Sequence, residues 1–198
     1  MGKGGKIVLV ALIVSAVWGI SYFISTGNKF VRLDQGVNSQ WAQVQNVYQR
    51  RFDLIPNLVE TVKGYASHER QTLQAVTEAR AKVGGVTNLR AEDLTQENLA
   101  RFQEAQAGLS GALQRLMVVV EQYPNLKANE NFIRLQDELA NTENRISQER
   151  RRFNEVVQDY NTAIKLFPAS LVASMRGFAA KSYFEAPTEA QQAPKVQF

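Results

Sequence analysis

An uncharged, strongly apolar stretch near the start of this chain constrains its fold more than any other feature. Residues Ile7–Ile24 read IVLVALIVSAVWGISYFI and include no charged residue. As a helix rising ~1.5 Å per residue this stretch is roughly 27 Å long, close to the ~30 Å hydrocarbon core of a bilayer. Three aromatic residues lie late in the stretch, where their rings favour a membrane interface. The pattern predicts a membrane-spanning helix.

Two interpretations of this stretch share a basic start and an apolar core: a permanent single-pass anchor and a cleavable signal peptide. We find no convincing small-x-small cleavage site after the stretch, no cysteine is available for lipid attachment, and the stretch exceeds the usual length of a signal core. We therefore expect residues 7–26 to be an anchor behind a short N-terminus, residues 1–6. Basic residues lie on both sides of it (Lys3 and Lys6 before, Lys29 and Arg32 after), so the side of the membrane on which the bundle lies stays open.

Composition limits the chemistry available to the remaining chain, which is long enough for one domain with a core of its own. It has no cysteine, which excludes disulfides, thiolate metal sites and thiol nucleophiles. The only histidine is His68. The net charge of +4 is modest and gives no reason to expect nucleic acid as a partner.

Apolar residues after the anchor recur every three or four residues, which is the period of an amphipathic helix. The first stripe predicts a helix that ends near Val83, before Gly84-Gly85, with a kink or a short break at Pro56. The second begins near Asp93 or Thr95, either of which could cap the helix, and ends before Pro124. The stripes contain Val37, Trp41, Val44, Tyr48, Ile55, Leu58, Val62, Tyr65, Leu73 and Val76, then Leu99, Phe102, Gln106, Leu109, Leu113, Leu116 and Val120.

The third stripe alternates four- and three-residue steps from Phe132 to Phe167 and predicts a nearly straight helix that Pro168 ends. Two polar residues, Thr142 and Glu149, fall inside it. Residues 171–178 predict a short fourth helix, and nothing alternates as a strand would. We predict an all-α fold: an N-terminal single-pass transmembrane helix followed by an elongated antiparallel bundle of three long helices and a short C-terminal helix over residues 27–184, with residues 185–198 an irregular tail.

A search for catalytic or metal-binding patterns returns negatives. Thr72 stands four residues after His68, where a zinc-protease helix needs a second histidine, and Tyr65 stands three before it, where a di-iron site needs glutamate. We expect no cofactor, no metal and no enzyme. If the protein is an enzyme after all, Glu149 is the one carboxylate at an inward position in the pattern.

Basic residues gather at two places and are the candidate contacts for a partner or for acidic lipid. Arg50 and Arg51 precede FDLIP, whose Asp53 and Pro56 we include because the expected kink would shape this region. The second cluster is Arg150, Arg151 and Arg152. A solvated, ion-paired surface is the plainer interpretation of both clusters, because consecutive residues fan around a helix.

Three blocks of this sequence resemble the bacterial LemA family. They are RRFDLIPNLVETVKGYASHERQTLQAVTEARA, then ENFIRLQDELANTENRISQERRRFNEVVQDYNTAIKLFP, and finally GFAAKSYFEA with PKVQF. The resemblance covers essentially the whole chain. It implies a membrane-anchored helical bundle of the bacterial cell envelope with no catalytic residues. The family is often described with its small N-terminus outside and its bundle in the cytoplasm, and relatives include a protein of magnetosome membranes.

The expected function is that of a non-catalytic, membrane-anchored structural or scaffolding protein of the bacterial inner membrane. We expect it to contact the lipid bilayer, to form a homo-oligomer through its long helical seams and to take part in membrane organisation. The alternative is an adaptor or sensor that docks an envelope protease, transporter or signalling partner.

Overall fold

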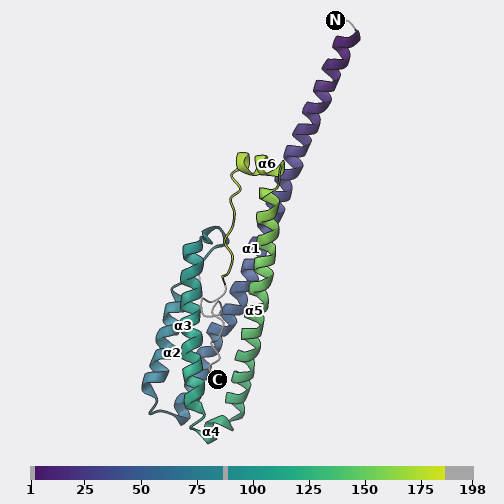
Figure 1. Ribbon diagram of the computed structural model, residues 1–198. Helices are drawn as coiled ribbons and strands as arrows, with labels where there is room; N and C mark the ends of the chain where they lie inside the picture. The colour runs from purple at the N-terminus through teal and green to yellow at the C-terminus, as the bar shows by residue number, and fades with distance from the viewer. Residues whose placement is uncertain (1–2, 87–88, 186–198) are drawn as a thin grey trace, which may run out of the picture. The chain divides into compact units, whose positions relative to one another are not determined.

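A computed structural model describes residues 3–86 and 89–185 of the chain (Figure 1). In this part of the chain every regular element is helical, which confirms the all-α prediction. The predicted tail, residues 185–198, lies outside the described residues except for Glu185, as do the first two residues. The elements are α1 (Lys3–Tyr65), α2 (Arg70–Gly84), the short 3-10 helix η1 (Ala91–Asp93), α3 (Gln96–Val120), α4 (Pro124–Lys127), α5 (Glu130–Lys165) and α6 (Ala169–Arg176).

The chain divides into two units, which are described separately. We call them the anchor unit (Met1–Ser39 with Glu155–Lys181) and the bundle unit (Gln40–Asn154 with Ser182–Phe198).

The first predicted helix is interrupted at a different place from the one expected. The helix runs through Pro56, so a break there is wrong, and α1 instead ends at Tyr65 before α2 begins at Arg70. A turn joins them, in which the Glu69 backbone N–H donates to the Ala66 carbonyl at 3.0 Å. Because α1 and α2 both face the same core, apolar residues keep the same spacing across the turn. The sequence pattern therefore does not show where α1 ends.

Pro56 is accommodated inside α1 by a contact from α2. Proline has no backbone N–H, so the carbonyl four residues earlier, that of Phe52, loses its usual helical donor. Arg80 replaces that donor: its Nε lies 3.3 Å from the Phe52 oxygen, and its guanidinium lies 3.8 Å from the centre of the Phe52 ring. One side chain therefore satisfies the freed carbonyl and packs on the same residue.

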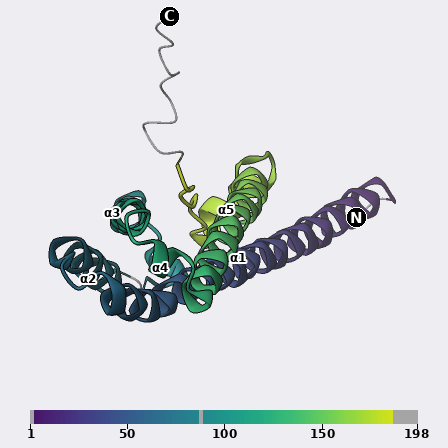
Figure 2. The same cartoon turned by 90° about the horizontal axis from the view of Figure 1, so that it is seen from below.

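The core of the bundle unit lies between α1, α2, α3 and α5. Figure 2 shows α2 beside α3 and α5 beside α1. Trp41 and Phe102 stack edge to face with ring centres 5.6 Å apart, and Phe153 and Phe184 complete the cluster. The first two predicted stripes are buried as expected, except Tyr65, which is exposed at the end of α1. The third stripe is buried only in part, since Leu135 and Glu149 are partly exposed. Thr95 caps α3 by accepting from the Asn98 backbone N–H at 3.2 Å.

In the anchor unit α1 passes from exposed to buried at one point. Of its described side chains, Thr26 is the first that is buried, and the apolar stretch before it lies open. Phe30 then packs on Phe178 with ring centres 5.4 Å apart, and Lys181 forms an ion pair with Asp34 at 2.7 Å. The third stripe reaches this unit too, but Phe167 is exposed because α5 ends at Lys165.

Candidate functional site

The two arginines of the first predicted cluster have different surroundings. Arg51 lies inside the bundle unit, with only 2% of its side chain exposed, whereas Arg50 is exposed and lies 3.9 Å from Glu138 of α5. Arg51 is therefore buried within the bundle unit, and Arg50 is the member of the pair that reaches solvent. The helix places neighbouring residues about 100° apart, so one of the pair faces the core and the other faces solvent.

Arg51 is the centre of a buried polar network between α1, α3 and α5. Its Nη1 donates to Glu143 Oε1 at 2.5 Å and to Ser110 Oγ at 3.0 Å. Its Nη2 donates to the backbone and side-chain oxygens of Gln106, and the guanidinium lies 5.4 Å from the centre of the Tyr48 ring. Among the described residues, Arg51 Nε and Gln106 Nε2 have no hydrogen-bond partner. The predicted candidate Arg51 therefore has a structural position.

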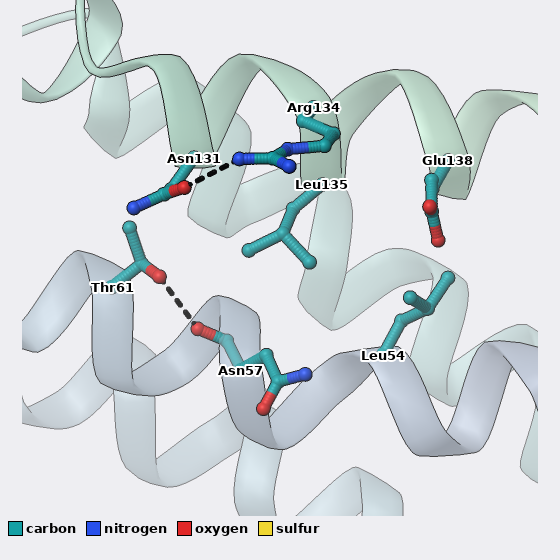
Figure 3. Close-up of a pocket in the computed structure, with 7 residues that line it drawn as sticks. All are labelled: Leu54, Asn57, Thr61, Asn131, Arg134, Leu135 and Glu138. Atoms are coloured by element: carbon teal, nitrogen blue, oxygen red, sulfur yellow. Dashed lines mark hydrogen bonds between the residues drawn. The ribbon is translucent and has the colours of Figure 1, made fainter.

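The other two predicted residues of α1, Asp53 and Pro56, are not among the residues that line the nearby hollow between α1 and α5. Asp53 and Pro56 are exposed, and Asp53 accepts a hydrogen bond from Gln49 at 2.8 Å. Figure 3 shows the neighbouring hollow of about 420 Å³, in which Arg134 donates to Asn131 at 2.7 Å. Its lining is Leu54, Asn57, Thr61, Asn131, Arg134, Leu135 and Glu138. A lining that contains a cation, a carboxylate and amides is typical of a polar protein surface, whereas small-molecule pockets are mainly apolar.

The second basic cluster is divided among three environments. Arg150 donates to the Glu185 carbonyl at 3.0 Å and lies 4.8 Å from the centre of the Phe184 ring, so it holds the C-terminal segment on α5. Arg152 forms an ion pair with Glu149 at 3.0 Å, while Arg151 is exposed. Only Arg151 and Arg152 of this cluster therefore present their charge at the bundle surface.

Two asparagines that the sequence did not single out also hold the segment after α6. Asn161 makes two hydrogen bonds with the backbone of Lys181, at 2.8 and 2.9 Å, and Asn154 makes two with the backbone of Phe184, both at 2.9 Å. Their spacing of seven residues, next to the apolar stripe, is the signal that could have identified them.

An apolar groove lies between α3 and α5 in the bundle unit, and we call it the α3–α5 groove. Its volume is about 700 Å³ and its lining is mainly apolar: Leu113, Met117, Val118, Leu139 and Ala140, with Ser110, Gln114, Gln136 and Glu143 at its polar edges. Val118 is 68% exposed. The run of three valines at the end of α3 exceeds what one buried stripe needs, and it is the sequence signal for this groove.

Glu149, the inward carboxylate of the third stripe, is engaged in hydrogen bonds. Glu149 accepts hydrogen bonds from Gln40 at 2.7 Å and from Arg152 at 3.0 Å. His68 is exposed in the turn after α1. Within residues 3–86 and 89–185, no three carboxylate or histidine side chains are arranged to hold a metal ion. Burial raises the pKa of Tyr48 above its usual 10.0, more than the nearby Arg150 and Arg51 lower it, so this hydroxyl stays protonated at neutral pH.

Comparison with known proteins agrees with this architecture. The family model described as LemA family matches residues 40–198. The chain belongs to the LemA family. The match begins at the first residue of the bundle unit, so it covers the helices that form the polar network, the hollow and the α3–α5 groove.

Individual relatives cover between 78% and 93% of the chain. Magnetosome protein MamQ of Magnetospirillum gryphiswaldense is 27% identical over 201 residues, which cover 93% of this chain and 74% of the relative. Magnetosome protein MamQ 2 of Paramagnetospirillum magneticum is 26% identical over 195 residues, 88% of this chain and 72% of the relative. Protein LemA of Metamycoplasma hominis is 25% identical over 157 residues, 78% of this chain and 68% of the relative.

One helix in the described part of the chain is long and apolar enough to cross a membrane. It is α1, whose most apolar 18-residue window has none of its residues buried. A helix that could span a bilayer therefore precedes the LemA-matched bundle.

Proposed function

We propose that this protein is a membrane-anchored structural or scaffolding protein of the bacterial inner membrane. The proposal rests mainly on one observation: the exposed apolar part of α1 leads into a bundle whose polar groups serve packing. Buried charges such as Arg51 are paired, and the inward carboxylate Glu149 is hydrogen-bonded. Family membership and likeness to magnetosome proteins support a membrane-associated, non-catalytic role.

Self-association and membrane organisation are the finer part of this proposal. The apolar stripes from which we expected self-association are mostly buried in the core of each chain. A contact between two copies therefore needs another surface. The α3–α5 groove, with Val118 exposed beside it, is the apolar surface of the bundle unit on which we place the contact between copies.

The test is the mass of the full-length protein, extracted in mild detergent and measured by light scattering with particle imaging. A regular assembly of many copies is expected, and Val118→Asp should reduce it to smaller species because a carboxylate would be desolvated in an apolar contact. Arg151→Asp, an exposed change on α5, is the matched control. A wild-type protein that stays monomeric in detergent and in lipid would refute self-association.

The second candidate is an adaptor that docks an envelope protein. The α3–α5 groove favours it, because an apolar trough with polar edges between two helices suits the apolar face of a partner helix. In this case the purified protein is small and carries a companion in fixed ratio, and Val118→Asp releases that companion. The Arg151→Asp variant should retain it unless the basic cluster is the docking surface.

A further inference from the structure

The anchor unit exposes four large apolar side chains in and just before its shortest helix. Leu166 and Phe167 lie between α5 and α6 and are 60% and 81% exposed; Leu171 and Met175 lie on α6 and are 58% and 76% exposed. We call these four residues the α6 patch. Leu171 and Met175 are four residues apart, so they share one face of α6, while Val172 and Ala173 face inward and are buried. Apolar groups gathered in this way on a surface mark a contact with a protein or a membrane.

Contacts within the anchor unit place α6 next to the end of the apolar stretch of α1. Phe178, which follows α6, packs on Phe30, and a side-chain carbon added to Gly27 would collide with Arg176 at the end of α6. Gly27 lies only three residues after Ile24, the last residue of the stretch, which is roughly 4.5 Å along a helix. Figure 1 shows α6 beside this part of α1. The α6 patch therefore lies at the depth where a bilayer spanned by α1 would end.

The charges around α6 fit an anionic lipid surface. Residues 1–33 and 160–181 contain no aspartate or glutamate, whereas Lys29, Arg32, Lys165 and Arg176 are basic and exposed. Basic side chains beside an apolar face are the composition of helices that lie in the headgroup region of a bilayer, and each cation there attracts acidic lipid. If the α6 patch bound an apolar protein partner instead, there would be no reason for acidic residues to be absent from both segments.

We propose that α6 is a second membrane contact: the α6 patch inserts into the interfacial layer of the bilayer that α1 spans, and the surrounding cations bind anionic headgroups. The inference rests on the anchor part of the proposed function, and it does not depend on self-association. It gives the anchor unit two attachments, one across the bilayer and one along its surface.

Site-specific fluorescent labelling can test this inference. The sequence has no cysteine, so each single-cysteine variant carries one label at a known position. Four full-length variants, Leu171→Cys, Met175→Cys, Val17→Cys and Ser67→Cys, are labelled with the fluorophore NBD and reconstituted in vesicles of phosphatidylcholine and phosphatidylglycerol. Nitroxide lipids then quench the label from the headgroup or from deep in the acyl chains. Val17 lies in the apolar stretch, and Ser67 is an exposed residue of the bundle unit.

Labels at Leu171 and Met175 should emit in the blue and should be quenched more by the headgroup nitroxide than by the deep one. The Val17 label should be quenched more by the deep nitroxide, and the Ser67 label should be quenched by neither. Shallow quenching at Leu171 should weaken in phosphatidylcholine alone, and equal quenching in both vesicles would overturn the electrostatic part. Water-like emission at Leu171 and Met175 with a deeply buried Val17 label would overturn the α6 contact and leave the anchor intact. Water-like emission at all positions would overturn both. Blue emission without lipid quenching would mean that protein covers the patch, which also refutes the inference.

Discussion

At the scale of single residues, Arg51 is the most consequential side chain of the bundle unit. Its guanidinium satisfies groups of α3 and α5 at once, so its removal leaves the buried Gln106 and the half-buried Ser110 without this donor. Arg51→Met should lower the free energy of unfolding by about 1–3 kcal/mol, because it leaves buried polar groups without a partner. The loss stays in this range because Glu143 is half-exposed and water can solvate its carboxylate. Urea unfolding of the full chain in mild detergent, followed by circular dichroism, measures the change.

The matched control for this prediction is Arg151→Met, the same change at an exposed site of α5, which should stay within about 0.5 kcal/mol of wild type. Replacing both Arg51 and Gln106 by methionine should recover part of the loss, because no polar group of that pair is then left without a partner. Equal stability of wild type and Arg51→Met would contradict a structural role for this arginine.

Tyr48 makes the stability of the bundle unit depend on alkaline pH. Burial raises the pKa of its hydroxyl above 10.0, so the folded protein holds this proton more tightly than the unfolded chain. The stability linked to the proton is therefore complete below pH 10.0 and is lost as the pH rises through the folded-state pKa. Between pH values below and above 10.0, wild type should lose more free energy of unfolding than Tyr48→Phe. An identical loss in both proteins would show that other groups cause the alkaline effect.

The sequence predicted which residues are buried better than it predicted what the polar ones do. An apolar stripe identifies a core face directly, which is why Trp41, Phe102 and Phe153 were expected to be buried and are. Arg51 lies three residues after Tyr48 and four before Ile55, on the buried face of the first stripe, but its partners Gln106 and Glu143 are on other helices. Such partners are far apart along the chain, so no local pattern identifies them.

At the scale of elements, the contact between Pro56 and Arg80 is a test of how α1 tolerates a proline. Arg80→Ala should destabilise the bundle unit by about 1 kcal/mol, because it leaves the Phe52 carbonyl without its donor and removes a cation–π contact. In a Pro56→Ala background the new backbone N–H can donate to the same carbonyl, so Arg80→Ala should cost less. A double-mutant cycle measured by urea unfolding gives this coupling. Purely additive effects would mean that Arg80 does not compensate for the proline.

The same region explains why the boundary between α1 and α2 could not be predicted. Proline is a strong local signal for a helix interruption, so a kink or a short break was expected at Pro56. A donor from α2 satisfies the carbonyl that the proline frees, so α1 continues there. The actual turn at Ala66–Glu69 contains no glycine or proline, and the nearby Gly64 lies inside α1. Helix ends that are set by tertiary contacts are therefore the part of this fold that local sequence rules miss.

At the scale of the whole molecule, the predicted separation into an apolar helix and a LemA bundle follows from composition. An uncharged stretch of 18 residues is informative by itself, because few soluble helices leave such a surface uncovered. The candidate surfaces were harder to predict. The α6 patch and the α3–α5 groove consist of ordinary leucines, valines and methionines, and they differ from core residues only in what the fold leaves uncovered.

The choice between a permanent anchor and a cleaved signal decides which of these surfaces the mature protein keeps beside a bilayer. Ser25-Thr26-Gly27 has the small-x-small pattern of a cleavage site, but we expect the N-terminal stretch to be retained because Thr26 and the nearby Phe30 are buried in the anchor unit. A peptidase would have to cut next to packed helix. The intact mass of the protein purified from membranes should include residues 1–26, and a variant without residues 2–26 should leave the membrane fraction or bind it only through α6, in a salt-sensitive way. A mature mass that lacks this stretch would identify a signal peptide and remove the basis for both membrane contacts.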